Sequence, residues 1–185
     1  MITTEKLHKS EKQRIMHKDF FDRSQLAIDQ GFYLEAICME YAAMEGRLEV
    51  LLGVLCAPCN HKLPDTERKK FQISHRIVCL EKTYTELDLF ENSKLNKSYF
   101  KSLEKWIESR NRYIHGLYKN EIMYEQRVKD KTLARKGLEF CRTLYDETNR
   151  VKRLMKRNPE LGIDIKICAS SNCHHCRNVI NDIKD

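Results

Sequence analysis

One long stretch of apolar residues at helical spacing, between residues 32 and 55, constrains the fold of this chain more than any other feature. Its apolar positions recur at steps of three and four residues, as the members of one helix face do. They are Leu34, Ile37, Cys38, Tyr41, Met44, Leu48, Leu51, Leu52 and Leu55. The pattern therefore predicts a helix over 32–55 with one strongly apolar face.

Stop and cap signals divide the rest of the chain into further helices. Gly31 is expected to end the first helix, a loop with two prolines over 56–66 precedes the third, and Asn158-Pro159 stops the last. A polar connection over 87–96 precedes a helix that starts near Asn96 or Ser98. The five predicted helices cover about 5–30, 32–55, 66–85, from 96 onward, and 121–157.

Because no alternating run is long enough for a sheet, we predict an all-α fold. A helical bundle over 1–158 would carry a short Cys/His-rich tail, 159–185, packed on it. Glycine costs roughly 1 kcal/mol relative to alanine inside a helix, so a bend or end is expected after His115, at Gly116, and an interruption at Gly137. Other positions expected on apolar faces include Ile15, Leu26, Val78, Cys38, Cys79 and Cys141.

The composition excludes several classes of protein. The 185 residues suit one domain, and 41% hydrophobic with 33% charged residues argues against disorder. No apolar run approaches the roughly 20 residues of a membrane span, and the N-terminus has no apolar signal region. We therefore expect a cytoplasmic protein without a membrane partner. The net charge of +7 favours a polyanionic partner.

Residues 109–118 hold the most distinctive polar pattern, an arginine followed by asparagine and, five residues after the arginine, a histidine. At about 100° per residue, Asn111, His115 and Tyr118 fall within roughly 60° of one another on a helix. Arg110 lies about 140° from His115, nearer an apolar seam. Within one straight helix the two groups diverge. They can meet at one phosphate only if the helix kinks or a second copy packs alongside.

This segment resembles the Arg-x4-His signature of the HEPN superfamily, which usually has a polar residue directly after the arginine. Arg110, Asn111 and His115 match it position by position, and 33–49 looks like the long second helix of such domains. The resemblance covers about residues 7–155. It implies a HEPN-like helical bundle that forms two-fold homodimers, with the motifs of both copies facing each other across the interface.

RNA cleavage without a metal requires a base for the 2′-hydroxyl proton, an acid for the leaving 5′-oxygen, and positive charge beside the phosphorane. The pKa of histidine, ordinarily about 6.5, suits His115 to proton transfer. The permanently charged fork of Arg110 suits the phosphorane. Asn111 is placed to orient the substrate or bridge to His115. Arg112 would contact a neighbouring phosphate, and Tyr118 a phosphate or a base.

The resulting hypothesis is a metal-independent RNA endonuclease that needs no cofactor for catalysis and leaves 2′,3′-cyclic phosphate and 5′-hydroxyl ends. Its substrate would be tRNA or mRNA. Family analogy alone adds the role of a toxin or effector in antiviral defence or in a toxin–antitoxin system, with an antitoxin or defence protein as partner. Some HEPN toxins carry a modified tyrosine two residues after the histidine, but Leu117 occupies that position here.

The main alternative is a non-catalytic HEPN-like module that binds RNA or a protein. On exposed helices, an Arg-Asn-Arg sequence is usually a solvated basic face. The two interpretations differ on whether His115 is accessible in a basic cleft or buried against apolar residues.

The sequence contains two Cys-x2-Cys pairs, Cys56/Cys59 and Cys173/Cys176. At this spacing the two thiolates of a pair can coordinate the same tetrahedral zinc ion. A structural zinc held by all four would tie the loop to the tail. His61, Cys168, His174 and His175 are alternative ligands. The other interpretation is unliganded loop thiols or a redox pair.

A basic cluster closes the last predicted helix: Arg150, Lys152, Arg153, Lys156 and Arg157. Cations at a helix C-terminus interact favourably with the helix dipole, which is an adequate structural reason for them. The same side chains are also suited to following an RNA backbone.

Overall fold

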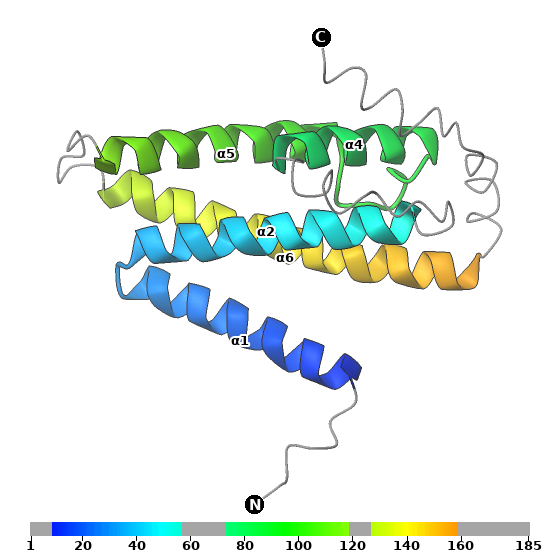
Figure 1. Cartoon of the computed structure of the whole chain (residues 1–185), viewed down its shortest axis with the longest axis horizontal. Helices are drawn as coiled ribbons and strands as arrows, with labels where there is room; N and C mark the ends of the chain where they lie inside the picture. The colour runs from blue at the N-terminus through cyan, green and yellow to red at the C-terminus, as the bar shows by residue number, and fades with distance from the viewer. Residues whose placement is uncertain (1–8, 57–72, 119–126, 159–185) are drawn as a thin grey trace, which may run out of the picture. The chain divides into compact units, whose positions relative to one another are not determined.

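The computed structural model describes residues 9–56, 73–118 and 127–158, and within these ranges it contains five α-helices and no strand (Figure 1). The predicted all-α class is therefore confirmed for this part of the chain. The predicted tail at 159–185 and most of the predicted loop lie outside the described residues. The helices are α1 (Lys9–Asp29), α2 (Tyr33–Cys56), α4 (Ile73–Glu86), α5 (Lys97–Tyr118) and α6 (Arg127–Arg157).

The helix ends follow from local signals in the sequence. Gly31 has a φ of 83°, and after it the amide of Phe32 donates to the carbonyl of Ala27 at 2.8 Å. This pattern caps a helix C-terminus and favours glycine at the left-handed position. At the start of α5, Asn96 Oδ1 accepts from the amide of Tyr99 at 2.8 Å, as an N-cap does.

Neither of these glycines ends its helix, so the expected end at Gly116 and the expected interruption at Gly137 were wrong, whereas a bend at Gly116 stays a prediction. α5 continues through Gly116 to Tyr118, and α6 continues through Gly137. Gly137 is buried, and a Cβ placed there would lie 2.6 Å from Trp106 Cζ2 and even closer to the carboxylate of Glu40. Close packing of neighbouring side chains explains this glycine.

We expect Gly137→Ala to lower the free energy of unfolding by about 1–3 kcal/mol, since overpacking outweighs the roughly 1 kcal/mol gain in helix propensity. Gly53→Ala in α2 is the matched control, because no heavy atom of a neighbouring residue lies within 4 Å of the point that its Cβ would occupy. That control should raise the free energy of unfolding by up to about 1 kcal/mol. Urea denaturation followed by circular dichroism measures both, and equal effects of the two variants would contradict the packing argument.

The helices contribute to two compact units. Among the described residues, unit 1 comprises 9–42, 106–118 and 127–139, and unit 2 comprises 43–56, 73–105 and 140–158. α2, α5 and α6 each supply residues to both. The predicted division into a bundle over 1–158 and a tail over 159–185 stays a prediction.

Unit 1 contains the Arg-Asn-x3-His segment at 109–118, and its core includes polar groups. Ser24 of α1 and Glu40 of α2 are both fully buried, and the Ser24 hydroxyl donates to Glu40 Oε1 at 2.7 Å. Ser24 lies on the buried face of α1 together with Ile28, and Glu40 lies on α2. Ile15 and Leu26, which were expected on an apolar face, are instead 50% and 55% exposed.

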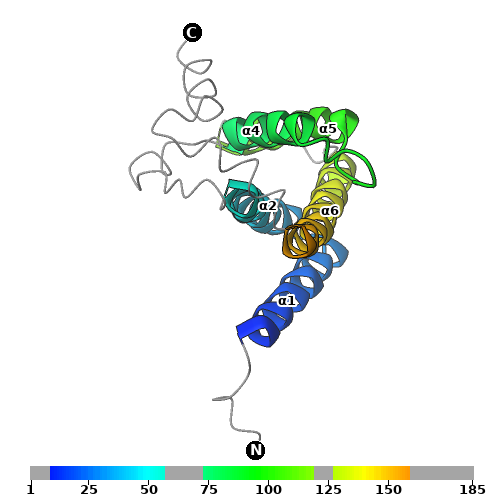
Figure 2. The ribbon, with the colours of Figure 1, turned by 90° about the vertical axis from the view of Figure 1, so that its right-hand side faces the viewer.

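Unit 2 has an apolar core in which α4 and α5 lie side by side (Figures 1 and 2). The rings of Tyr84 and Phe100 meet edge to face, with centroids 6.1 Å apart. Val78 of α4 is exposed, contrary to its expected apolar face. Of the three cysteines expected in the core, Cys141 is buried, Cys79 is half-buried and Cys38 is exposed.

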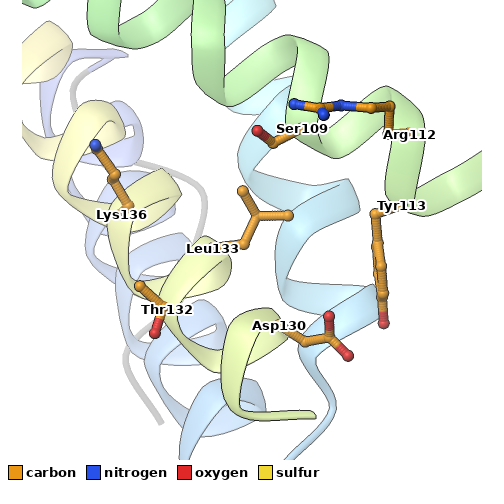
Figure 3. A pocket seen from close by; sticks show the side chains of 7 residues that line it. All are labelled: Ser109, Arg112, Tyr113, Asp130, Thr132, Leu133 and Lys136. Carbon is orange, nitrogen blue, oxygen red and sulfur yellow. The ribbon is translucent and has the colours of Figure 1, made fainter. Parts of the chain in front are cut away.

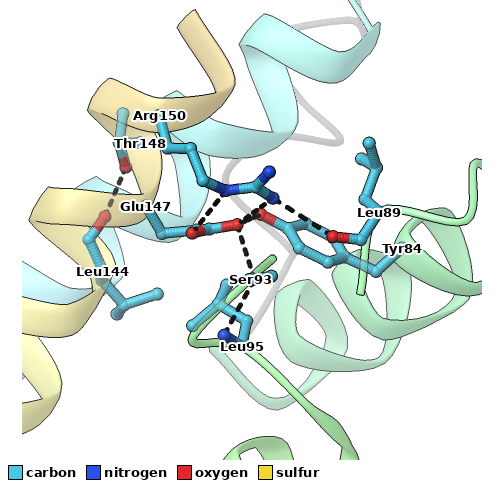
Figure 4. Close-up of polar contacts among 8 residues, drawn as sticks. All are labelled: Tyr84, Leu89, Ser93, Leu95, Leu144, Glu147, Thr148 and Arg150. Atoms are coloured by element: carbon cyan, nitrogen blue, oxygen red, sulfur yellow. Dashed lines mark hydrogen bonds and ion pairs between the residues drawn. The ribbon is translucent and has the colours of Figure 1, made fainter. Parts of the chain in front are cut away.

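A buried carboxylate in unit 2 explains one member of the basic cluster. Glu147 accepts hydrogen bonds from Tyr84, Ser93 and Arg150, and Arg150 also donates to the Leu89 carbonyl at 3.1 Å (Figure 4). Arg150 is thus a structural residue. The other four cations of the cluster are exposed.

Candidate functional site

The second half of α5 carries the predicted site residues, and buried residues fix it within unit 1. Trp106 and Ile107 are buried, and the indole Nε1 of Trp106 donates to the carbonyl of Leu133 in α6 at 2.8 Å. The polar residues that follow on α5 are therefore displayed from a helix that is anchored to its neighbour.

Arg110 is turned toward α2. Its guanidinium carbon lies 4.2 Å from the centre of the Tyr41 ring, in cation–π geometry, and its Nη1 donates to Asn111 Oδ1 at 3.0 Å. Its Nε is buried and has no hydrogen-bond partner among the described residues. The position agrees with the expectation that Arg110 lies near the apolar seam.

His115 is exposed, as are Asn111 and Arg112, whereas Arg110 is half-buried. Because α5 stays helical across both positions, the structure brings Arg110 together with Asn111 but not with His115 of the same chain. Arg112 and His115 are three residues apart and so project within about 60° of each other. Arg112 is therefore the arginine on the histidine side of the helix.

The remaining predicted site residues lie outside what the structure describes. α5 ends at Tyr118, whose side chain is beyond the described residues, and the same holds for Cys56 at the end of α2. Cys59, Cys173 and Cys176 fall wholly outside them. Within the described part of the chain, no group of three or more His, Cys, Asp or Glu residues is placed to hold a metal ion. The zinc site stays a prediction.

A cleft of about 420 Å³ opens in unit 1 between α5 and α6 (Figure 3). We call it the α5–α6 cleft. It is lined by one face of each helix: Ser109, Arg112 and Tyr113 from α5, and Asp130, Thr132, Leu133 and Lys136 from α6. Of these, sequence reasoning singled out only Arg112. The spacing 109, 112, 113 marks one helix face, but nothing in the sequence indicated that α6 would face it.

Asp130 and Tyr113 are joined by a hydrogen bond at one end of this cleft. Burial, together with the negative charge of Asp130, raises the pKa of Tyr113 to about 12. Burial also raises the pKa of the Asp130 carboxyl, and the hydrogen bond from Tyr113 opposes that shift. Tyr113 therefore stays a neutral hydrogen-bond donor at physiological pH.

None of the described helices is both long enough and apolar enough to cross a membrane.

The similarity of this chain to known proteins gives no family assignment. The chain matches no protein-family model, no curated protein and no solved structure.

Proposed function

We propose that this protein is a metal-independent RNA endonuclease of the HEPN type, with a composite active site formed by two copies of α5. The observation that supports it best is the exposure of His115, on a helix that holds Arg110 in a defined position. An imidazole that reaches solvent can exchange protons with a substrate, whereas one buried among apolar residues cannot.

In the proposed reaction, His115 of one copy takes the proton of the 2′-hydroxyl, and the 2′-oxygen attacks the adjacent phosphorus. The bond from phosphorus to the 5′-oxygen breaks, the same imidazole returns the proton to that oxygen, and the second copy supplies Arg110 to the composite site. Arg110 stabilises the charge on the phosphorane. The products are a 2′,3′-cyclic phosphate and a 5′-hydroxyl, so the scheme requires no metal, oxidant or other co-reactant.

Tyr41 and Asn111 would act as positioning residues. The guanidinium carbon of Arg110 lies 4.2 Å from the centre of the Tyr41 ring, and Asn111 accepts a hydrogen bond from Nη1 of Arg110. A guanidinium held in place before the substrate binds loses little side-chain entropy during the reaction. The remaining donors of Arg110 would then contact the phosphate.

A second candidate is a non-catalytic HEPN-like module that binds RNA or a protein partner. The observation in its favour is that Arg110 is half-buried and already donates to Asn111, which restricts its access to a phosphate. The wider role, in antiviral defence or in a cytoplasmic toxin–antitoxin pair, rests on family analogy.

Cleavage of total tRNA and mRNA in EDTA tests the enzyme. We expect His115→Ala and Arg110→Ala each to lower the rate at least about 100-fold, the usual scale for loss of an acid–base or charge-stabilising group. Lys101→Ala, at an exposed position on the same helix, should leave the rate unchanged. An all-deoxy substrate should stay intact because it lacks the attacking hydroxyl.

Mixing the two inactive variants tests whether the site is composite. A mixed dimer retains one Arg110 and one His115 on different chains, so partial activity should return if the two act across the interface. Cleavage that persists in His115→Ala would remove the acid–base role. RNA binding by the wild type without any cleavage would instead favour the non-catalytic module.

A further inference from the structure

The α5–α6 cleft is framed by two hydrogen bonds that connect its walls. Near one end, Trp106 Nε1 donates to the Leu133 carbonyl at 2.8 Å, and at the other end Tyr113 donates to Asp130. Both bonds join α5 to α6, so the cleft is held open at a defined width. Its volume of about 420 Å³ lies within the range of about 300–1,000 Å³ typical of small-ligand sites.

The two ends of the cleft differ in charge. Arg112 on α5 and Lys136 on α6 are exposed on opposite walls of the cleft, Asp130 lies at its far end beside Tyr113, and the apolar side chain of Leu133 lies between the three (Figure 3). A ligand that fits this arrangement carries an anionic group at one end, a flat apolar middle, and a hydrogen-bond donor at the far end. A nucleotide has all three: a phosphate, the face of its base, and an amino group on the base edge.

The position of Arg112 links the cleft to the proposed active site. Arg112 and His115 project from the same side of α5, one helical turn apart. An RNA strand whose scissile phosphate lies beside His115 would therefore bring a neighbouring nucleotide to the cleft. Arg110, on the other side of the helix, packs on Tyr41 and does not line it.

We propose that the α5–α6 cleft binds one nucleotide of a single-stranded RNA, with its phosphate on Arg112 and Lys136 and the amino group of its base on Asp130. This inference rests on the proposed function, since it assigns the nucleotide beside the cleavage site. The guanidinium fork of Arg112 matches two phosphate oxygens. The carboxylate of Asp130 accepts from the amino group of cytosine, adenine or guanine, whereas uracil lacks that group.

Titration of the 5′-monophosphates of cytidine and uridine, followed by amide NMR shifts, tests the site directly. Mononucleotides contain no scissile linkage, so this readout is independent of cleavage. We expect shifts around 109–113 and 130–136 and a preference for the cytidine nucleotide of about tenfold. Shifts confined to other parts of the chain, or equal affinity for inorganic phosphate alone, would overturn the assignment.

Variants separate the two ends of the cleft. Arg112→Gln and Lys136→Gln should each weaken binding of both nucleotides about tenfold, the scale of one charge-assisted hydrogen bond. Arg135→Gln is the matched control, because it removes the same charge from an exposed position of α6 that does not line the cleft. If Arg135→Gln weakened binding as much as Arg112→Gln, the phosphate contact would be disproved.

The contact between Asp130 and the base is tested with a variant that leaves no buried polar group without a hydrogen-bond partner. Tyr113→Phe/Asp130→Ala removes both members of the hydrogen bond and should abolish the preference for cytidine, while Tyr113→Phe alone keeps the carboxylate and the preference. Loss of the preference in Tyr113→Phe alone would overturn the role of Asp130. If nucleotides bind as described but RNA is never cut, the proposed enzyme fails and the nucleotide site stands.

Discussion

Glu147→Ala should lower the free energy of unfolding by about 3–5 kcal/mol, because it leaves a partly buried cation and two hydroxyls without their acceptor. The Glu147 side chain is 2% exposed and that of Arg150 is 26% exposed. Tyr84 and Ser93 each donate to Glu147 Oε1 at 2.7 Å, and Arg150 Nη2 donates at 2.6 Å (Figure 4). The loop residues Leu89 and Ser93 are thereby connected to α6, so the variant should also loosen the connection between α4 and α5.

Asp146→Ala is the matched control for this prediction. Asp146 neighbours Glu147 on the same helix and pairs with Lys94 at 3.2 Å, but both of these side chains are more than half exposed. Exposed ion pairs contribute at most about 1 kcal/mol, so this variant should change stability little. Urea denaturation at pH 7 compares the two, and similar losses in both would contradict the burial argument.

The contribution of Glu147 to the free energy of unfolding should decrease as the pH falls. Burial alone would raise the pKa of Glu147, but the hydrogen bonds from Arg150, Ser93 and Tyr84 together lower it below its ordinary value. A carboxyl with a lowered pKa in the folded state contributes stability at neutral pH, and that contribution is lost as the pH falls through the folded pKa. Glu147→Ala should therefore differ less from wild type in acid than at pH 7.

Glu40→Gln should stabilise the protein at pH 8, on the order of 3 kcal/mol. Burial raises the pKa of Glu40 to about 8, and the hydrogen bond from Ser24 only partly opposes this shift. The folded chain therefore binds a proton that the unfolded chain releases near pH 4.5. Stability from this group is fully present below about pH 4.5 and falls as the pH rises to about 8. Glutamine keeps an acceptor for Ser24 and cannot ionise.

Unfolding by urea at pH 5 and at pH 8 measures this effect as a difference between the two pH values. The gain from Glu40→Gln should be small at pH 5 and large at pH 8. Glu35→Gln, at an exposed position of α2, should show no such dependence. If the two variants had the same dependence on pH, the buried carboxyl would not be the source of it.

The two cases differ because the surroundings of the carboxylates differ. Glu147 is buried with a guanidinium and two hydroxyl donors, and these stabilise its charge. Glu40 is buried beside Ser24, Trp106 and Gly137, where burial outweighs the hydrogen bond from Ser24 to Oε1. Both positions fall on helices that the sequence predicted, but the sequence contained no signal that distinguished their protonation states.

The sequence by itself determined the helices and most of their ends. Apolar steps of three and four residues predicted α2, and Gly31 and Asn96 marked boundaries that the structure confirms. These features depend on backbone conformation and on neighbours within about one helical turn, which the sequence states directly.

Only the tertiary structure decided which side chains meet across helices. It placed Arg110 on Tyr41, joined Tyr113 to Asp130, and packed Glu40 and Trp106 against Gly137. Each of these contacts joins residues from separate helices, many positions apart in the chain. Helical periodicity specifies the face on which a residue lies, but the partner of that face depends on how the helices pack, which no local pattern encodes.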